Sequence, residues 1–148
     1  MSDHTLHSGV EIVNSRVFRV SREVLFDAFA DPKKLEQWWG PDEFSNSFHL
    51  FEFREGGKWE FTMHGPDETE FLNDKEFVEI VPNERIVLRH IQPTHLFLMT
   101  ISFAEAEGGT LLTWKMVFDS YCGENLQKFI ACANEQNFDR LEKALIDL

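Results

Sequence analysis

The side chains best suited to acid–base or metal chemistry in this sequence are its six histidines. They are His4, His7, His49, His64, His90 and His95. No two have the i, i+4 spacing that places two metal ligands on one helix face, and no HExxH motif occurs. We therefore expect no metal site. The simpler interpretation of each histidine is a solvent-facing or hydrogen-bonded side chain. His49 and His90, which fall in expected strands, are the two that could be buried and act as a general base.

Three other polar residues could orient a ligand. Glu79 and Arg89 fall on neighbouring expected strands and are predicted to form a cross-strand ion pair, either on the surface or facing inward toward a ligand. Asn137 interrupts the apolar stripe of the last expected helix. It lies either at the edge of that stripe or in the interior, where a ligand or a water would have to satisfy its amide.

Motifs for nucleophilic or nucleotide-dependent catalysis are missing. Cys122 and Cys132 are ten residues apart, which fits no metal-ligand spacing. The sequence has no G-x-S-x-G, no P-loop and no G-x-G-x-x-G. No catalytic residue can be assigned, and no cofactor is expected.

The composition limits the partners. The net charge is −12, from 26 acidic and 14 basic residues, which argues against nucleic acid and anionic membranes as partners. Fifteen Phe and four Trp against one Tyr predict an apolar interior. Two cysteines, no apolar run of 18 residues and no signal-peptide pattern favour a cytoplasmic location.

The chain is expected to begin with a strand and two short helices. Residues 1–9 are polar and predicted to be flexible, and a strand covers residues 10–20. Ser21 is a predicted N-cap for a helix over residues 22–30. Asp31 is a predicted N-cap for a second helix over residues 32–39, which Gly40-Pro41 ends.

A run of alternating segments then predicts an antiparallel meander. The expected strands cover residues 44–53, 58–64, 70–81, 85–91, 94–104 and 110–118, with turn residues between them. Residues 124–148 contain no Pro or Gly, and their apolar residues recur with helical period. The stripe comprises Leu126, Phe129, Ile130, Ala133, Leu141, Ala144, Leu145 and Leu148, with Asn137 as its polar member.

This order predicts an α+β fold of the helix-grip type: a curved antiparallel sheet of six to seven strands with a long C-terminal helix across its concave face. The space between sheet and helix is either filled or a pocket. The residues expected to line it are Trp38, Trp59, Phe61, Met63, Phe77, His90, Phe97, Met99, Trp114, Met116, Phe129, Ala133 and Asn137. Plain core packing is the alternative for the strand residues. Of the adjacent Trp38 and Trp39, either one ring gates the pocket mouth, or one lies in the core and the other on the rim.

Five local motifs in this order resemble the START/SRPBCC superfamily, and within it the homologues of the activator of the heat-shock-chaperone ATPase (AHSA type). They cover residues 19–29, 31–41 with Trp-Trp-Gly-Pro at the end, 55–61 with Gly-Gly before an aromatic strand, 77–86 and 109–113. The sequence departs from the family at residues 134–138, where a Gly-Trp pair is common and Phe138 is expected to replace the aromatic ring.

The resemblance implies one domain over residues 1–148 that binds a small hydrophobic molecule, such as a lipid, a polyketide-like compound or an aromatic metabolite. Two alternatives stay open: a cyclase or hydrolase acting on an apolar substrate, and a chaperone-associated interaction module. Strands that are apolar on both faces leave both a monomer and a homodimer open.

Overall fold

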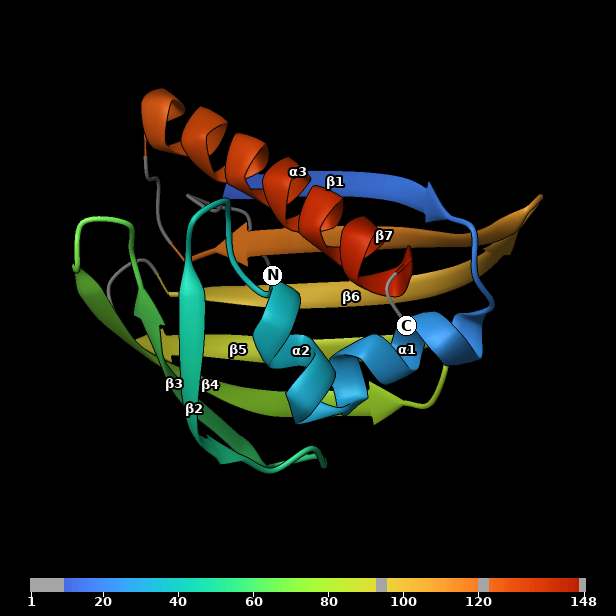
Figure 1. Cartoon of the computed structure of the whole chain (residues 1–148), viewed down its shortest axis with the longest axis horizontal. Helices are drawn as coiled ribbons and strands as arrows, with labels where there is room; N and C mark the ends of the chain where they lie inside the picture. The colour runs from blue at the N-terminus through green and yellow to red at the C-terminus, as the bar shows by residue number, and fades with distance from the viewer. Residues whose placement is uncertain (1–9, 93–95, 120–122, 147–148) are drawn as a thin grey trace, which may run out of the picture.

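The computed structural model describes residues 10–92, 96–119 and 123–146. Its elements follow the predicted order (Figure 1). They are β1 (Val10–Phe18), α1 (Arg22–Ala30), α2 (Pro32–Trp38), β2 (Ser45–Phe51), β3 (Lys58–His64), β4 (Glu70–Val81), β5 (Arg85–Gln92), β6 (Phe97–Ala106), β7 (Gly109–Phe118) and α3 (Glu124–Ile146). The predictions about residues 1–9, His95, Cys122 and Leu148 lie outside the described residues.

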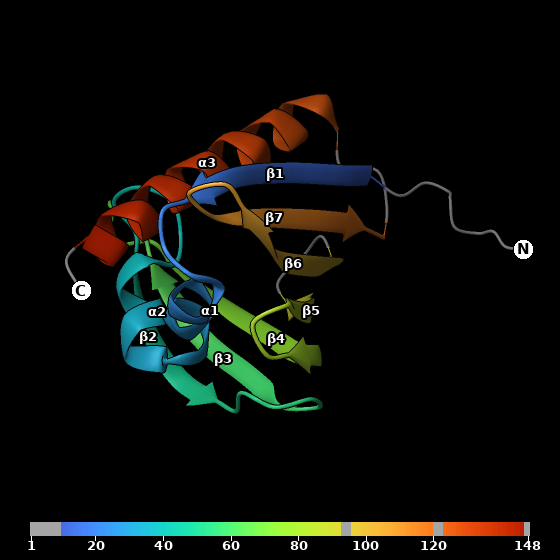
Figure 2. The ribbon, with the colours of Figure 1, turned by 90° about the vertical axis from the view of Figure 1, so that its right-hand side faces the viewer.

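The seven strands form one antiparallel sheet in the order β1-β7-β6-β5-β4-β3-β2. Strands β2 to β7 each pair with their neighbours in sequence, and β1 joins the far edge through β7, with Val10 opposite Phe118. The sheet curls, and all three helices lie against its concave face (Figures 1 and 2). The predicted helix-grip architecture is confirmed.

Helix starts are set by the capping residues that the sequence indicates. The Ser21 hydroxyl accepts a hydrogen bond from the Val24 backbone N–H at 3.2 Å, and the Asp31 carboxylate accepts one from the Lys33 N–H at 3.0 Å. Each satisfies a donor that the first helical turn leaves open. Both predicted N-caps are confirmed.

The β2 edge of the sheet is tied to α2. The Glu36 carboxylate accepts a hydrogen bond from the Phe48 N–H at 3.3 Å. The Asn46 amide donates to the carbonyls of Glu36, at 3.2 Å, and Trp39, at 2.8 Å. A strand edge otherwise offers open backbone groups to another chain, so these bonds occupy part of that edge.

Several boundaries differ from the prediction. The second strand is shorter than residues 44–53, and β6 begins at Phe97 rather than at residue 94. The register also shifts in β4 between Asp74 and Lys75 and between Phe77 and Glu79. Such bulges are set by pairing with β5, which the sequence of one strand does not show.

Candidate functional site

One end of the interior, beneath α1 and α2, is packed with aromatic rings. The Trp38 ring lies edge-on to Phe29 at 4.9 Å, and Trp39 packs on Trp59 at 5.0 Å and Trp114 at 5.3 Å (centroid distances). The Trp38 indole N–H donates to the Ala28 carbonyl at 3.1 Å. Both Trp38 and Trp39 are buried, so neither gates a pocket mouth nor lies on a rim.

The space left at this end is negligible. A cavity bordered by Phe29, Trp39, Trp59 and their neighbours has a volume of about 10 Å³, no more than one water molecule needs. This half of the interior, called the closed end below, is core and not a pocket.

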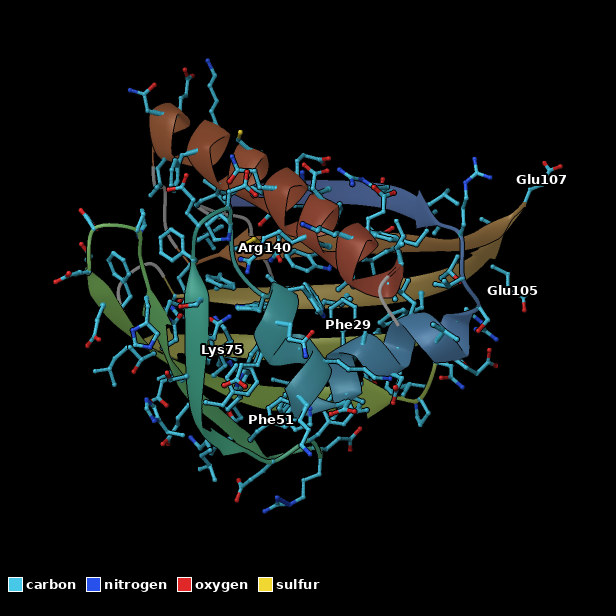
Figure 3. All side chains as sticks on the ribbon, viewed as in Figure 1. Phe29, Phe51, Lys75, Glu105, Glu107 and Arg140 are labelled. Carbon is cyan, nitrogen blue, oxygen red and sulfur yellow. The ribbon has the colours of Figure 1, made fainter. Side chains whose placement is uncertain are left out.

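A buried pair of polar side chains lies on the same concave face, farther along the strands. Lys75 on β4 and His90 on β5 are directly opposite each other in the sheet. The Lys75 Nζ lies 2.9 Å from the His90 Nδ1, a hydrogen bond. The two residues are only 4% and 5% exposed. Figure 3 labels Lys75 on the inner side of the curled sheet, whereas Glu105 and Glu107 extend from the far tip.

Aromatic rings surround the Lys75–His90 pair. The Lys75 Nζ lies 5.1 Å from the ring centroid of Phe97 and 5.7 Å from that of Phe61, within the range of cation–π attraction. The His90 ring stacks on Phe97 at 4.6 Å with an interplanar angle of 14°. The cation is thus held by π faces and one imidazole.

This environment changes the acidity of Lys75. Burial lowers the pKa of its ammonium group from the ordinary 10.5 to about 7, because the charged form loses its hydration. Lys75 therefore exists as a mixture of ammonium and neutral amine near neutral pH. Strongly perturbed groups in an interior mark candidate functional sites.

Two further donors face the interior without a partner. The indole N–H groups of Trp59 and Trp114 are buried and make no hydrogen bond to the described residues. The Asn46 Oδ1, near α2, is likewise buried and unpartnered. Each such group costs free energy, on the order of 1–3 kcal/mol, until an acceptor or donor reaches it.

Helix α3 is anchored to the sheet and to the α2–β2 connection by its second half. The Asn137 side-chain oxygen accepts from the Gly40 N–H at 3.2 Å. The Arg140 guanidinium donates to the carbonyls of Gly40, at 2.9 Å, and Pro41, at 2.8 Å. Asn137 is therefore buried and satisfied by backbone, which resolves the alternatives left open for it.

The first half of α3 is loosely covered. No residue from 124 to 133 is fully buried, whereas Asn134, Asn137, Phe138 and Leu141 are. Phe129 is 66% exposed, so its predicted place in the lining is wrong. Ala133 is half-buried. The helix is rotated relative to the predicted stripe because its buried face includes two asparagines.

The Asn134 amide explains part of that rotation. It donates to the Asn14 side-chain oxygen on β1 at 3.0 Å and contacts the Met116 sulfur at 3.4 Å. The Asn14 amide in turn donates to the Ala131 carbonyl and to Glu135. A satisfied polar chain thus joins α3 to β1 inside the molecule.

A pocket of about 410 Å³ lies at the ends of β5, β6 and β7. Its described walls are Arg89, His90, Ile91, Leu96, Phe97, Leu98, Val117 and Asp119. His90 and Phe97 are also the direct neighbours of Lys75. However, Arg89, Leu98 and Val117 lie opposite one another on the face of the sheet turned away from Lys75. Most of this pocket therefore belongs to the outer face of the sheet.

The remaining predicted lining residues share the concave side. Trp38, Trp59, Phe61, Phe77, Met99, Trp114 and Met116 are buried, and Met63 and Phe97 are half-buried. Trp38, Trp59, Phe77 and Trp114 contribute to the closed end, whereas His90, Phe97 and Phe61 surround Lys75. The sequence analysis missed Lys75. Its spacing of two from Phe77 places both on one face of a strand and was the available signal.

The other polar candidates lie on the surface. His49 is exposed and bonds Thr62, and His64 bonds Ser47 and Glu70. The predicted Glu79–Arg89 pair is wrong: Glu79 pairs with Arg85 at 2.8 Å, and Arg89 pairs with Glu76 at 3.3 Å. The β4 bulge after Phe77 sets Arg89 opposite Glu76.

Within the described ranges, no group of three His, Cys, Asp or Glu residues is placed to hold a metal ion. The described helices likewise include none that is long and apolar enough to cross a membrane. The Lys75–His90 pair is thus the one buried contact between two ionisable side chains that the described residues show.

The curled seven-stranded sheet, the two short helices and the long closing helix define a START/SRPBCC-type helix-grip domain. A family model described as activator of Hsp90 ATPase homolog 1-like protein matches residues 19–145. The chain belongs to this family, which confirms the resemblance seen in the motifs.

Solved structures agree on the fold. A protein from Nitrosomonas europaea is 18% identical, with a TM-score of 0.81 over 93% of this chain and 94% of that one. A protein from Chromobacterium violaceum is 22% identical, with a TM-score of 0.79 over 91% of this chain and 96% of that one. A protein from Arthrobacter aurescens is 23% identical, with a TM-score of 0.80 over 95% and 87%. A comparison with curated protein sequences finds no match.

Proposed function

We propose that this protein binds a small, largely apolar molecule between the sheet and α3, with the polar group of the ligand at the Lys75–His90 pair. The observation that carries the proposal is the buried Lys75 amine, enclosed by His90, Phe61 and Phe97. The closed end is filled, so the ligand space belongs to the other half of the interior.

The energetics of Lys75 support a role in binding rather than in folding. An amine with a pKa lowered by burial destabilises the folded chain relative to an apolar residue of similar length. A side chain that costs stability in an otherwise apolar core is typical of a functional site.

The surroundings supply what an apolar ligand needs. Phe61 and Phe97 contact Lys75, and further apolar side chains lie on the same face of the sheet, namely Met99, Met116 and Phe118. The first half of α3 above the β1 edge buries none of its residues fully, so its displacement breaks few close contacts.

A second function is favoured by the same hydrogen bond. Two nitrogen bases 2.9 Å apart in a water-poor interior can accept and return a proton, which a lyase or isomerase of an apolar substrate requires. The two functions differ in one result: a binding protein releases the captured compound unchanged, whereas an enzyme releases a different one.

Native mass spectrometry of the freshly purified protein tests the proposal. We expect a non-covalent adduct of a few hundred daltons on the folded chain, absent from the denatured chain. The fraction of folded protein that carries the adduct should fall in Lys75→Met. It should be unchanged in Lys115→Met, which removes an exposed lysine paired with Glu11. Lack of any adduct, together with no binding of apolar probes such as decanoate and decanamide, would refute the proposed function.

A further inference from the structure

We infer that Ser47, His64 and Glu70 form a serine-hydrolase triad on the outer face of the sheet, which cleaves short, uncharged esters with Ser47 as the nucleophile. In this site His64 is the general base, and Glu70 positions it. The site is separate from the ligand site proposed above, and neither depends on the other. The inference stands on the hydrogen bonds among the three side chains, the exposure of Ser47 and the hollow beside it.

Strand pairing brings the three side chains together. His64 on β3 lies directly opposite Glu70 on β4, and Ser47 on β2 lies opposite Thr62, two residues from His64. Side chains alternate along a strand, and Phe61 is buried in the core, so Thr62 and His64 lie on the outer face. All three helices lie against the concave face (Figure 2). None of the described helices therefore covers the triad.

Both ring nitrogens of His64 are engaged, each in the sense that general-base catalysis requires. The Ser47 Oγ lies 2.8 Å from the His64 Nε2, and the His64 Nδ1 lies 3.1 Å from the Glu70 Oε2. A carboxylate can only accept, so the Nδ1 carries the hydrogen, and the Nε2 of the neutral ring accepts from the Ser47 hydroxyl. A nucleophile bonded to a base that a third group orients is the arrangement of a serine hydrolase.

The nucleophile is accessible from solvent. Ser47 is exposed, and the side chain of His64 is 33% exposed. A hollow of about 260 Å³ lies nearby, and its walls are His49, Glu60, Leu72, Asn73 and Asp74. Leu72 lies opposite Thr62, and Asp74 lies opposite Glu60, which places the hollow on the outer face as well. Since His49 is two residues from Ser47 on β2, the hollow begins beside the nucleophile.

The hollow favours a short, uncharged acyl group. Its volume is just below the usual range of small-molecule sites, which limits the size of the substrate. Leu72 is 72% exposed and offers apolar surface. Glu60 and Asp74 lie directly opposite each other on β3 and β4, and their carboxylates repel an anion. An ester that carries a carboxylate or a phosphate should therefore bind poorly.

The hydroxyl of Thr62 is the donor for the ester carbonyl oxygen. Thr62 lies directly opposite Ser47, and its Oγ1 is 2.8 Å from the His49 Nε2. With the His49 Nε2–H donating to this oxygen, the hydroxyl hydrogen of Thr62 is left to bind the substrate. Such a donor stabilises the negative charge that develops on a carbonyl oxygen during acyl transfer.

The reaction has two steps. In the first, the Ser47 Oγ attacks the carbonyl carbon, the His64 Nε2 takes the hydroxyl proton, and the carbonyl π electrons move to the oxygen. The tetrahedral intermediate collapses, the bond to the alcohol breaks, and the leaving alcohol takes the proton from His64. In the second step, water attacks the acyl-Ser47 ester in the same way and releases the acid. The net reaction consumes one ester and one water, releases one acid and one alcohol, and regenerates the free hydroxyl of Ser47.

Hydrolysis of 4-nitrophenyl butyrate by the full chain tests the inference. Ser47→Ala and His64→Gln should each lower kcat/KM by about 100-fold, the lower end of what a positioned base contributes. Ser45→Ala is the matched control and should keep the wild-type rate, since Ser45 is exposed on the same strand and lies directly opposite His64. Glu70→Gln should lower kcat and leave KM unchanged, because Glu70 acts only through His64.

A fluorophosphonate probe identifies the nucleophile. An attacking oxygen displaces fluoride from the probe and keeps the phosphonyl group, which peptide mapping by mass spectrometry then locates. We expect the label on Ser47 in wild type and in Ser45→Ala, and slower labelling of Ser47 in His64→Gln. The inference is overturned if wild type carries no label on Ser47, or if wild type hydrolyses the ester no faster than Ser47→Ala. Either result leaves the proposed ligand site between the sheet and α3 untouched.

Discussion

Replacement of Lys75 by methionine should change how stability depends on pH. Burial lowers the pKa of this lysine from 10.5 to about 7 in the folded chain. Between these values the unfolded chain binds the proton and the folded chain does not, so stability rises with pH. The penalty is fully present below pH 7, where both states are protonated. At about 1.4 kcal/mol per pKa unit, it amounts to about 5 kcal/mol.

Urea unfolding measures this effect between pH 7 and pH 9. Wild type should gain about 2 kcal/mol over this range relative to Lys75→Met, integrated from the proton difference between the two states. At pH 7 the methionine variant should be the more stable of the two. Methionine matches the length of the lysine stem and packs against rings.

The control is Lys115→Met, since Lys115 is exposed and pairs with Glu11 on the surface. Its stability difference from wild type should stay within about 0.5 kcal/mol across the same range. If the difference between wild type and Lys75→Met is flat with pH, Lys75 is not held in a dry environment. The argument for its functional role would then fail.

Two further substitutions test the packing around the site. Asn137→Ala leaves the buried Gly40 N–H without its acceptor and should lower the free energy of unfolding in urea by about 1–3 kcal/mol. The control is Gln136→Ala, which removes an exposed acceptor for the Asp42 N–H and should lower it by under about 1 kcal/mol. Equal losses would contradict this assignment. Gly57→Ala should lower the free energy of unfolding by at least about 3 kcal/mol, because a Cβ at this position would lie 2.1 Å from the Glu52 carbonyl oxygen. Gly56→Ala, with φ +81° but open space, should cost only about 1–2 kcal/mol, and the reverse order would show that backbone conformation outweighs the clash.

The order of elements could be predicted because local residues determine it. Ser21 and Asp31 cap their helices in the structure as their types indicate. Gly40 and Gly56 adopt positive φ at the ends of their elements. These signals act over a few residues, so no knowledge of the tertiary structure is needed.

The face of α3 could not be predicted from hydrophobicity. Asn134 and Asn137 occupy its buried side because Asn14 and the Gly40 backbone satisfy them. These partners lie about a hundred residues away in the chain, beyond the reach of a local pattern. An apolar stripe that includes Phe129 therefore gave the wrong rotation.

The sequence analysis also missed Lys75. A lysine in a strand that alternates with Asp74 and Glu76 is typical of a solvent face. Its spacing of two from the buried Phe77 does indicate the inner face, but a charged side chain is rarely expected there. Its contact with His90 depends on the pairing of β4 with β5, which only the structure shows.

The pairing of β1 with β7 has a consequence for how the chain is made. Strands β2 to β6 each find a partner among their neighbours in sequence, but Val10 pairs with Phe118. At synthesis rates of about 5–20 residues per second, β1 waits on the order of 5–20 s for its partner to leave the ribosome. Its alternating apolar side chains, Val10 and Ile12 among them, are buried only after that. In a nascent or truncated chain, this first strand is the segment left without a partner longest and the natural point of attack for chaperones and proteases.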